Sequence, residues 1–179
     1  MTAQDRISPA RELHLNVSVP FERAHAMPKS VYTSPEFLAQ EQRHVFAKDW
    51  ICAGRAETLP NPGDYLTLEI GEDSVIIVRD DDGEIRALMN ICRHRGARVC
   101  EGAAGNRKTF VCPYHGWVFS TDGALRNVPM PQGYGEHSRQ TLDGLGLARV
   151  ARSQTYRGFV FASLAADGPG LLESLGPIV

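Results

Sequence analysis

The pattern of apolar and polar positions predicts β-strands from residue 50 onward. Over residues 65–70 leucine and isoleucine alternate with threonine and glutamate, and residues 74–79 form a run rich in valine and isoleucine. Asp82-Gly83 is a typical two-residue hairpin turn before the next apolar stretch, at 84–90. Shorter apolar stretches follow at 109–111, 118–119 and 157–163. Because such strands are short and separated by turn residues, we expect a mainly β, antiparallel fold.

The first third of the chain has a different pattern. Residues 1–33 contain scattered prolines and no sustained period, so we expect an extended arm there. Ser-Pro-Glu at 34–36 then supplies an N-cap, a proline in the first turn and an acidic residue near the helix N-terminus. A helix is expected from there to about Asp49. Its core-facing residues should be Phe37, Leu38, Val45 and Phe46.

Composition narrows the class of protein. The chain has 179 residues, 42% of them hydrophobic, which is enough for one buried core plus an extension. A net charge of −2 argues against a nucleic-acid partner. No apolar run approaches the ~20 residues that span a bilayer, and residues 1–18 lack the apolar segment of a signal peptide. These features predict a soluble cytoplasmic protein without a membrane partner.

Two cysteines and two histidines carry the chemistry. Cys92 and His94 form C-x-H, seventeen residues follow, and Cys112 and His115 form C-x-x-H. Two thiolates and two imidazoles on paired loops are the ligand set of a Rieske [2Fe–2S] cluster. A structural zinc site is the alternative, although zinc ligand pairs usually combine like residues. The other two cysteines, Cys52 and Cys100, are expected to be buried free thiols, with a disulfide between them left open.

The residues around these four sharpen the interpretation. The first loop reads Asn-Ile-Cys-Arg-His-Arg-Gly-Ala over 90–97, and the second reads Cys-Pro-Tyr-His-Gly-Trp over 112–117. Both strongly resemble the cluster loops of the Rieske non-haem iron oxygenases, also called ring-hydroxylating oxygenases. The resemblance is densest over residues 34–123 and extends more weakly to Phe161.

This resemblance implies a small antiparallel Rieske domain of the ISP-like fold, with an N-terminal arm and helix. The expected organisation is an arm at 1–33, then a helix plus the Rieske domain at 34–166, with cluster loops 92–97 and 112–117. Residues 167–179 are expected to be a connector toward a catalytic domain that is absent from this chain.

The resemblance also implies individual roles. Cys92 and Cys112 would hold one iron, while His94 and His115 would hold the other. In the family, a histidine at the position of His115 faces the mononuclear iron of an adjacent subunit through a bridging carboxylate, which would lie outside this chain. Trp117 and Tyr114 are expected to pack around the cluster and exclude water.

By the same resemblance, the function is electron transfer within the terminal oxygenase component. Electrons would pass from NAD(P)H through a flavin reductase, a ferredoxin or both to a mononuclear Fe(II), which oxygenates an aromatic or quaternary ammonium substrate. That iron needs two histidines and a carboxylate, and only His137 follows His115, so no catalytic residue is expected here. The expected assembly is an α3 or α3β3 homotrimer. A stand-alone Rieske ferredoxin is the alternative.

Basic residues without intervening acids are concentrated near the two loops. They are interpreted as a docking face for an acidic ferredoxin, a reductase or an acidic patch of the next subunit. The alternative is an ordinary solvated rim. The residues are Arg93, Arg95, Arg98, Arg107 and Lys108.

Overall fold

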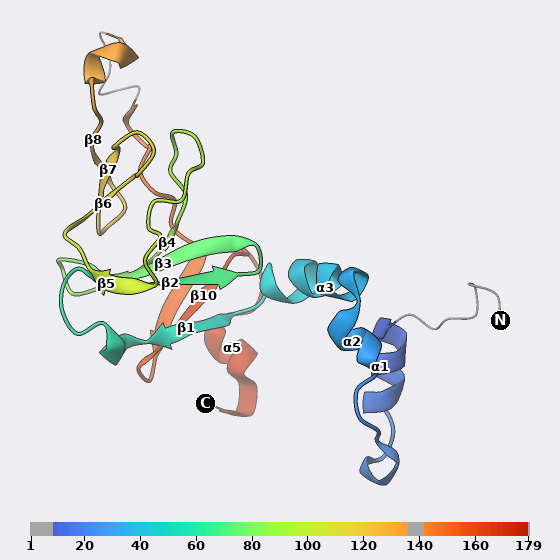
Figure 1. Ribbon diagram of the computed structural model, residues 1–179. Helices are drawn as coiled ribbons and strands as arrows, with labels where there is room; N and C mark the ends of the chain where they lie inside the picture. The colour runs from blue at the N-terminus through green and yellow to red at the C-terminus, as the bar shows by residue number, and fades with distance from the viewer. Residues whose placement is uncertain (1–8, 136–141, 179) are drawn as a thin grey trace. The chain divides into compact units, whose positions relative to one another are not determined.

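The structure, a computed structural model, describes residues 9–135 and 142–178, so His137 lies outside the described residues. The chain divides after Val45 into two compact units (Figure 1). Each unit is considered separately below. In the part of the chain that the structure describes, no helix combines the length and apolarity needed to cross a bilayer.

The N-terminal unit is helical, and the expectation of an extended arm is wrong for much of it. Its elements are α1 (Pro9–Val17), the 3₁₀-helix η2 (Phe21–Arg23), α2 (Lys29–Thr33), α3 (Pro35–Glu41) and the π-helical turn η3 (Gln42–Phe46). The short helices lie between the prolines that weakened the sequence signal. Proline at a first helical turn is tolerated, because that position has no intrahelical donor to lose.

The predicted cap of α3 is confirmed, since the Ser34 hydroxyl accepts a hydrogen bond from the Phe37 amide at 3.1 Å. The predicted buried face is only partly right. Phe37 is buried and Phe46 half-buried, whereas Leu38 and Val45 are exposed. For Val45 the physical reason lies in η3, because a π turn adds a residue and breaks the 3.6-residue spacing on which that prediction depended.

The second unit is built from antiparallel strands in three small sheets, as the sequence predicts. The first sheet has the order β1-β10-β9, the second β4-β3-β2-β5 and the third β6-β7-β8. The strands are β1 (Ile51–Arg55), β2 (Asp64–Ile70), β3 (Asp73–Arg79), β4 (Ile85–Met89), β5 (Ala104–Asn106), β6 (Thr109–Val111), β7 (Val118–Ser120), β8 (Leu125–Asn127), β9 (Arg152–Tyr156) and β10 (Phe159–Ser163). Short helical segments are η4 (Ala56–Thr58), η5 (Pro131–Tyr134), α5 (Leu171–Leu175) and η6 (Gly176–Ile178).

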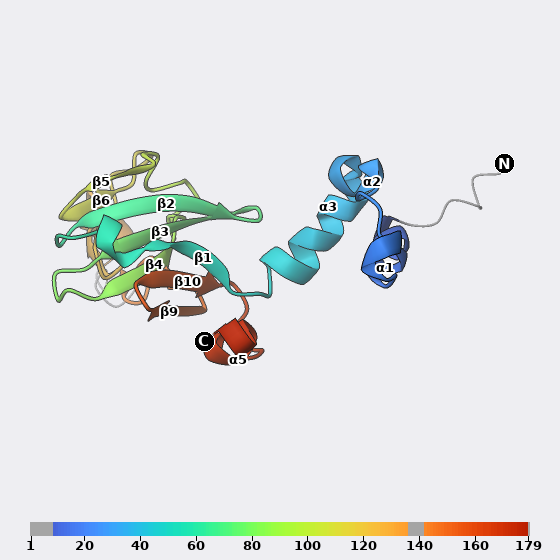
Figure 2. The same ribbon diagram turned by 90° about the horizontal axis from the view of Figure 1, so that it is seen from below.

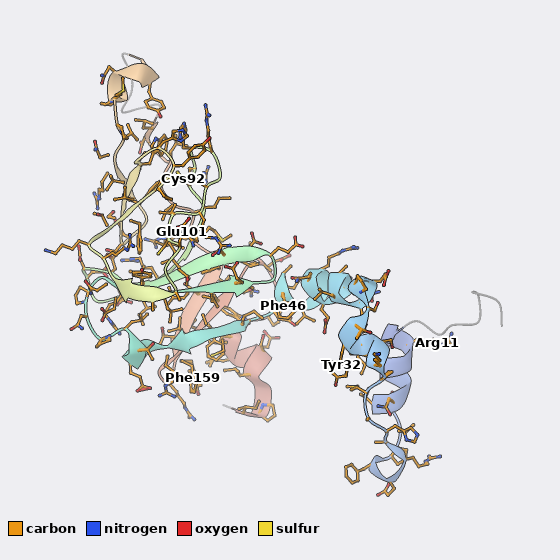
Figure 3. All side chains as sticks on the ribbon, viewed as in Figure 1. Arg11, Tyr32, Phe46, Cys92, Glu101 and Phe159 are labelled. Carbon is orange, nitrogen blue, oxygen red and sulfur yellow. The ribbon has the colours of Figure 1, made fainter. Side chains whose placement is uncertain are left out.

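Strand β3 is buried on both faces and separates two hydrophobic cores. Val75 and Ile77 join the core formed with β1 and β10, which lie beside the β2–β3–β4 sheet in Figure 2. Ile76 and Val78 point the other way, because side chains alternate along a strand, and join a core with the third sheet and the two loops. Figure 3 places Cys92 beyond the central sheet, on the same side as β6, β7 and β8.

Two turns differ from the sequence prediction. The β3–β4 connection is a longer loop over 80–84 and not a two-residue turn at Asp82-Gly83. In this loop the Asp80 carboxylate accepts hydrogen bonds from the Thr121 hydroxyl and the Arg86 guanidinium. Arg157 and Gly158, expected to begin the last strand, instead form the β9–β10 hairpin turn with positive φ angles of 48° and 81°.

The segment after β10 is tied to the rest of this unit. Arg152 donates to the carbonyl oxygens of Ala165 and Pro169 at 2.8 Å each, and its guanidinium lies 4.7 Å from the centre of the Trp50 ring. Trp50 in turn donates through Nε1 to Pro169 at 3.1 Å. Helix α5 follows and buries Leu171. The function of residues 167–179 as a connector stays a prediction.

Candidate metal centre

The two ligand-bearing loops are folded alike. In each loop the cysteine amide donates to the carbonyl five residues later, and the cysteine carbonyl accepts from the glycine amide four residues later. The donor–acceptor distances are 2.8 and 2.9 Å in the loop at Cys92, and 2.8 and 3.0 Å in the loop at Cys112. Strand β4 leads into the first loop, and β6 and β7 flank the second. The sequence therefore places both cysteines in the same kind of backbone turn.

Glycine is required in both turns for a conformational reason. Gly96 and Gly116 have φ angles of 72° and 67°, in the left-handed region that other residues rarely adopt. A Cβ on Gly116 would also lie 3.1 Å from Cγ of Pro129, which is tighter than an ordinary contact. These positions therefore resist substitution through backbone geometry alone.

A buried asparagine at the end of β4 anchors the first loop. The Asn90 side-chain amide donates to the Cys100 carbonyl at 2.7 Å and to the Ser74 hydroxyl at 3.1 Å. Its carbonyl oxygen accepts from the amides of Val99 and Cys100 at 3.1 and 2.8 Å. Sequence reasoning gave Asn90 no role, because the residues that it joins converge only in the folded chain.

The thiols of Cys92 and Cys112 are buried, each with 2% of its residue surface exposed, and they interact with each other. Burial raises the pKa of the Cys92 thiol above its ordinary value, while the amides of His94 and Arg95 act against that rise by hydrogen bonding to the sulfur. A buried thiolate needs compensating positive charge, and a bound metal provides it.

The imidazoles of His94 and His115 face each other, with ring centroids 4.6 Å apart and an interplanar angle of 71°. Their Nδ1 atoms are buried and have no hydrogen-bond partner among the described residues. Burial lowers the pKa of His94, and the charges of His115 and Arg95 lower it further. A neutral imidazole with an unpaired inward nitrogen is the form that binds a metal.

The aromatic surroundings differ between the two histidines. Trp117 is buried and stacks on His94, with ring centroids 4.9 Å apart and an interplanar angle of 8°, and its Nε1 donates to the Tyr134 hydroxyl at 3.3 Å. Tyr114 stacks on His115 at 3.8 Å but is 59% exposed. Both rings thus pack on proposed ligands, Trp117 in the core and Tyr114 at the surface, and their exclusion of water from a cluster stays a prediction.

The chemistry of the donor set matches that of an iron–sulfur cluster. In the described ranges 9–135 and 142–178, no three His, Cys, Asp or Glu side chains converge closely enough to hold one metal ion. A Rieske cluster takes two cysteines on one iron and two histidines on the other. The buried thiols and the two unpaired Nδ1 atoms thus fit a [2Fe–2S] group.

Comparison with known protein families agrees with this chemistry. Residues 49–146, more than half of the chain, match the Rieske [2Fe-2S] domain. The chain belongs to the Rieske domain family. The matched region contains both loops, so the family implies a [2Fe–2S] cluster in this Rieske domain. The identity of its ligands is inferred below.

Relatives of this Rieske domain are large subunits of dioxygenases. The chain is 40% identical over 147 residues to the large oxygenase component of the naphthalene 1,2-dioxygenase system of Pseudomonas fluorescens, covering 82% of this chain and 32% of that protein. It is 39% identical over 155 residues to the biphenyl 2,3-dioxygenase subunit alpha of Rhodococcus jostii (strain RHA1), covering 87% and 33%. The chain therefore spans about one third of the length of these curated relatives.

Solved structures give the same assignment of fold. A naphthalene 1,2-dioxygenase with indole in its active site superposes with a TM-score of 0.75 at 39% identity, covering 83% of this chain and 33% of that one. The quaternary ammonium Rieske monooxygenase CntA, in complex with an inhibitor, gives 0.71 at 29%, covering 83% and 40%. The predicted mainly β Rieske fold with an N-terminal helix is confirmed.

The basic residues near the loops do not form one uniform set. Arg98 pairs with Glu69 at 2.8 Å, and the Arg107 guanidinium lies 5.9 Å from the Tyr65 ring centre. Arg93 instead lines a cavity with two arginines that sequence reasoning missed, Arg126 and Arg149. These residues are far apart in sequence, so no local pattern could associate them.

The two cysteines outside the loops differ in burial. Cys100 is a buried free thiol, as expected, whereas Cys52 is free but exposed. Cys52 lies in β1, an edge strand whose register shifts between Cys52 and Gly54 at a bulge. Its neighbour Ala53 is buried, so the alternation of side chains along the strand turns Cys52 outward.

Proposed function

We propose that this chain is the Rieske electron-transfer part of the terminal component of a ring-hydroxylating oxygenase. The observation that carries the proposal is the pair of unpaired, buried Nδ1 atoms of His94 and His115 next to two buried cysteines. Buried polar atoms are almost always satisfied in folded proteins. Two such atoms left unpaired side by side are best explained by a metal partner.

Each pair of like residues would hold one iron of the cluster. Cys92 and Cys112 would hold one iron through their sulfurs, and His94 and His115 would hold the other through Nδ1. A Rieske cluster bound there supplies one-electron oxidation and reduction. The backbone amides that donate to the Cys92 sulfur favour the thiolate, and Trp117 shields the His94 side from water.

The proposed electron path begins at NAD(P)H and passes through a flavin reductase, a ferredoxin or both. It ends at a mononuclear Fe(II) carried outside these 179 residues, in the catalytic domain of an adjacent subunit of an α3 or α3β3 assembly. Support comes from the relatives, which are named as components of dioxygenase systems. Their similarity covers 82–87% of this chain and so exceeds the Rieske region itself, which a stand-alone Rieske ferredoxin would not require.

For the substrate of the whole oxygenase we favour an aromatic hydrocarbon over a quaternary ammonium compound. The identity to a naphthalene dioxygenase structure is 39%, against 29% for the quaternary ammonium monooxygenase CntA. Substrate specificity itself belongs to residues of a catalytic domain, so this part of the proposal rests on relatedness alone.

The cluster is tested by analysis of the purified chain. We expect a red-brown protein with two irons and two acid-labile sulfides per chain, and with the EPR signature of a reduced Rieske centre. The protein is purified anaerobically, and its iron, acid-labile sulfide and zinc contents per chain are measured. A colourless protein with one zinc per chain would contradict the proposal.

The ligand assignment is tested by substitution of matched cysteines. Cys112→Ser should abolish the visible absorbance and destabilise the fold, because the free energy of metal binding is part of the folding free energy. Cys100→Ser is the control, since Cys100 is equally buried in the same core. His115→Cys should remove the Rieske EPR signature. Normal spectra for the Cys112→Ser and His115→Cys variants would show that the ligands are misassigned.

The chain should transfer electrons without catalysing oxygenation. With NADH, reductase, ferredoxin and naphthalene, we expect its cluster to be reduced and no oxygenated product to form, because a non-haem oxygenase site needs two histidines and a carboxylate. No such group occurs in the described residues. Optical reduction and chromatography of products measure the two outcomes. Product formed by this chain alone would contradict the prediction.

A further inference from the structure

A cavity of ≈ 840 Å³ opens beside the first ligand loop. One wall is the β7–β8 hairpin from Asp122 to Val128, the opposite wall is the stretch 142–149, and Arg93 of the first loop closes one side. Arg93 lies between Cys92 and His94 in the sequence. The cavity therefore adjoins the first ligand loop, which carries Cys92 and His94. The β7–β8 hairpin that forms its wall can be followed in Figure 1.

Three arginines line the cavity and give its wall a positive charge. The side chains of Arg93 and Arg149 are exposed and form no hydrogen bond or ion pair with the described residues. Arg126 is partly engaged, because it donates to the Ser120 hydroxyl at 2.8 Å and lies 3.5 Å from the Asp122 carboxylate. The cavity wall thus presents two guanidinium groups, each with five donors and a permanent charge, that pair with no carboxylate of residues 9–135 and 142–178.

The acidic residues of the wall do not cancel this charge. Asp122 accepts hydrogen bonds from the Ser120 hydroxyl and from the Ala124 amide at 2.9 Å, so its carboxylate is already engaged on its own hairpin. Asp143 lies on the exposed opposite wall. With three arginines against two aspartates, the cavity keeps a positive balance beside Arg93 and Arg149.

The exposed side chains that flank the two cysteines are chemically different from the cavity wall. Ile91, Val111 and Tyr114 are 45%, 44% and 59% exposed, and none of them lines the cavity. Ile91 and Val111 precede the two cysteines, and Tyr114 stacks on His115. Apolar surfaces are typical of permanent interfaces, whereas transient electron-transfer contacts are small, polar and steered by charge. The basic cavity is the surface suited to a partner that binds and leaves.

We propose that this arginine-lined cavity is the docking site of an acidic one-electron carrier protein, which places carboxylates between Arg93 and Arg149. The inference rests on the proposed function. In the step that follows docking, the reduced iron–sulfur centre of the carrier loses one electron and is oxidised, while the centre held at His94 gains that electron. No bond is formed or broken. Entry beside the first loop leaves the exposed Tyr114 ring, which stacks on His115, available for a permanent contact.

Binding provides a test that does not depend on enzyme activity. The probe is a purified, oxidised acidic [2Fe–2S] ferredoxin of the plant type, titrated into the full 179-residue chain carrying its cluster, at low and high salt. We expect Arg93→Gln/Arg149→Gln to weaken binding by about tenfold at low salt and to flatten its salt dependence. Reduction by the reduced ferredoxin should slow by a similar factor, while reduction by dithionite stays unchanged.

A matched variant controls for the loss of two charges. Arg55→Gln/Arg157→Gln removes two arginines on β1 and the β9–β10 turn, outside the cavity wall, and should bind ferredoxin as the wild type does. Arg149→Gln alone is the second test variant, because Arg93 lies between two proposed ligands and its loss could affect cluster assembly. Arg149→Gln should lower affinity several-fold with a normal visible spectrum.

The alternative outcomes are distinguishable. Unchanged ferredoxin binding by both cavity variants, equal weakening by the control pair, or no binding by the wild type would overturn the docking site. A change of oligomeric state in the variants, measured by sedimentation, would assign the surface to contact between copies of this chain and also overturn it. Failure of the wild-type chain to carry a cluster would contradict the proposed function. Ferredoxin binding, which is measured independently of cluster content, would still decide the docking site.

Discussion

At the scale of single residues, the proposed centre depends on what surrounds each imidazole. Trp117 covers the His94 ring almost in parallel and is fixed by its own hydrogen bond to Tyr134. The ring that stacks on His115, Tyr114, is instead 59% exposed. The two histidines are therefore unequal although their loops are folded alike, and the indole is the side chain that sets the difference.

Replacing Trp117 by alanine should cost about 3–5 kcal/mol of unfolding free energy, because a large buried ring is lost and a cavity remains. It should also speed loss of the cluster in air, since water reaches His94. Tyr134→Phe is the matched variant, which removes only the hydrogen bond to the indole and should cost about 0.5–1.5 kcal/mol. Urea unfolding and the bleaching rate of the visible absorbance measure both. Equal bleaching rates in Trp117→Ala and the wild type would contradict this role.

At the scale of elements, a charged contact fastens the β3–β4 loop to the β7–β8 turn. Asp80 is buried and accepts from the Thr121 hydroxyl at 2.5 Å and from Nε of Arg86 at 2.6 Å. Burial acts to raise the pKa of Asp80, but the hydrogen bonds from Thr121 and Arg86 outweigh it and leave that pKa below its ordinary value. The hairpin following the second ligand loop is held to the central sheet by this carboxylate.

Asp80→Asn should cost about 1.5–3 kcal/mol of unfolding free energy near neutral pH, because hydrogen bonds to a charged group are lost or weakened. Since the pKa of Asp80 is lowered on folding, this stabilisation is complete above the ordinary carboxyl value of about 3.9 and disappears as the pH falls through the folded-state pKa. Urea unfolding of both proteins from pH 7 to pH 3 should show the difference shrinking only at the acid end. The exposed neighbour Asp81, as Asp81→Asn, is the control.

The elements that the sequence predicted are those with a strong local signal. Strands β2 and β3 have clear alternation or β-branched runs, and the Ser34 cap identifies the start of α3. The strands for which no stretch was named are β1, β5, β8 and β9. They are short or lack a clear apolar alternation, and their pairing partners rather than their own residues stabilise them. The length of the β3–β4 loop was predicted wrongly because Asp80 accepts a hydrogen bond from Thr121, 41 positions away in the sequence.

The four proposed ligands were within reach of sequence reasoning because each pair lies in one short loop with a fixed spacing. The arginine cavity was not, since Arg93, Arg126 and Arg149 converge only through the packing of the β7–β8 hairpin. Asn90 was missed for the same reason, as its partners are backbone groups. Ligand motifs within one loop can be predicted from a sequence. Surfaces formed by several elements can be identified only once the fold is known.

At the scale of the whole molecule, Arg152 joins the start and the end of the second unit. Its guanidinium donates hydrogen bonds to the carbonyls of Ala165 and Pro169 and packs on the Trp50 ring. Trp50 also donates a hydrogen bond to the Pro169 carbonyl. A planar guanidinium can make several directed hydrogen bonds while stacking on a ring, which an ammonium cannot do. The segment that leads out of the β-sheets is thereby fixed rather than free to swing.

Arg152→Gln should raise hydrogen exchange at the backbone amides of residues 165–171, because the carbonyls held by the guanidinium lose their donor and α5 loses its anchor. Arg152→Lys should give an intermediate effect. Exchange followed by mass spectrometry resolves this segment, and Arg157→Gln is the control, since Arg157 lies in an exposed turn and its guanidinium packs on the neighbouring Tyr156 ring. Identical protection of residues 165–171 in the Arg152→Gln and wild-type proteins would refute the anchoring role.

The position of β3 between two cores has a consequence for how the protein matures in the cell. Among the described residues, the core shared with β1 and β10 includes none of the proposed ligands, while the other contains Cys92, Cys112 and Trp117. We therefore expect newly made chains to assemble one half of the second unit before any iron arrives, and to present the two loops on that scaffold to the proteins that deliver clusters. Under iron starvation the protein should then accumulate as a partly folded form without a cluster, which binds a cluster when iron is restored. It should not accumulate as an unfolded chain that proteases degrade.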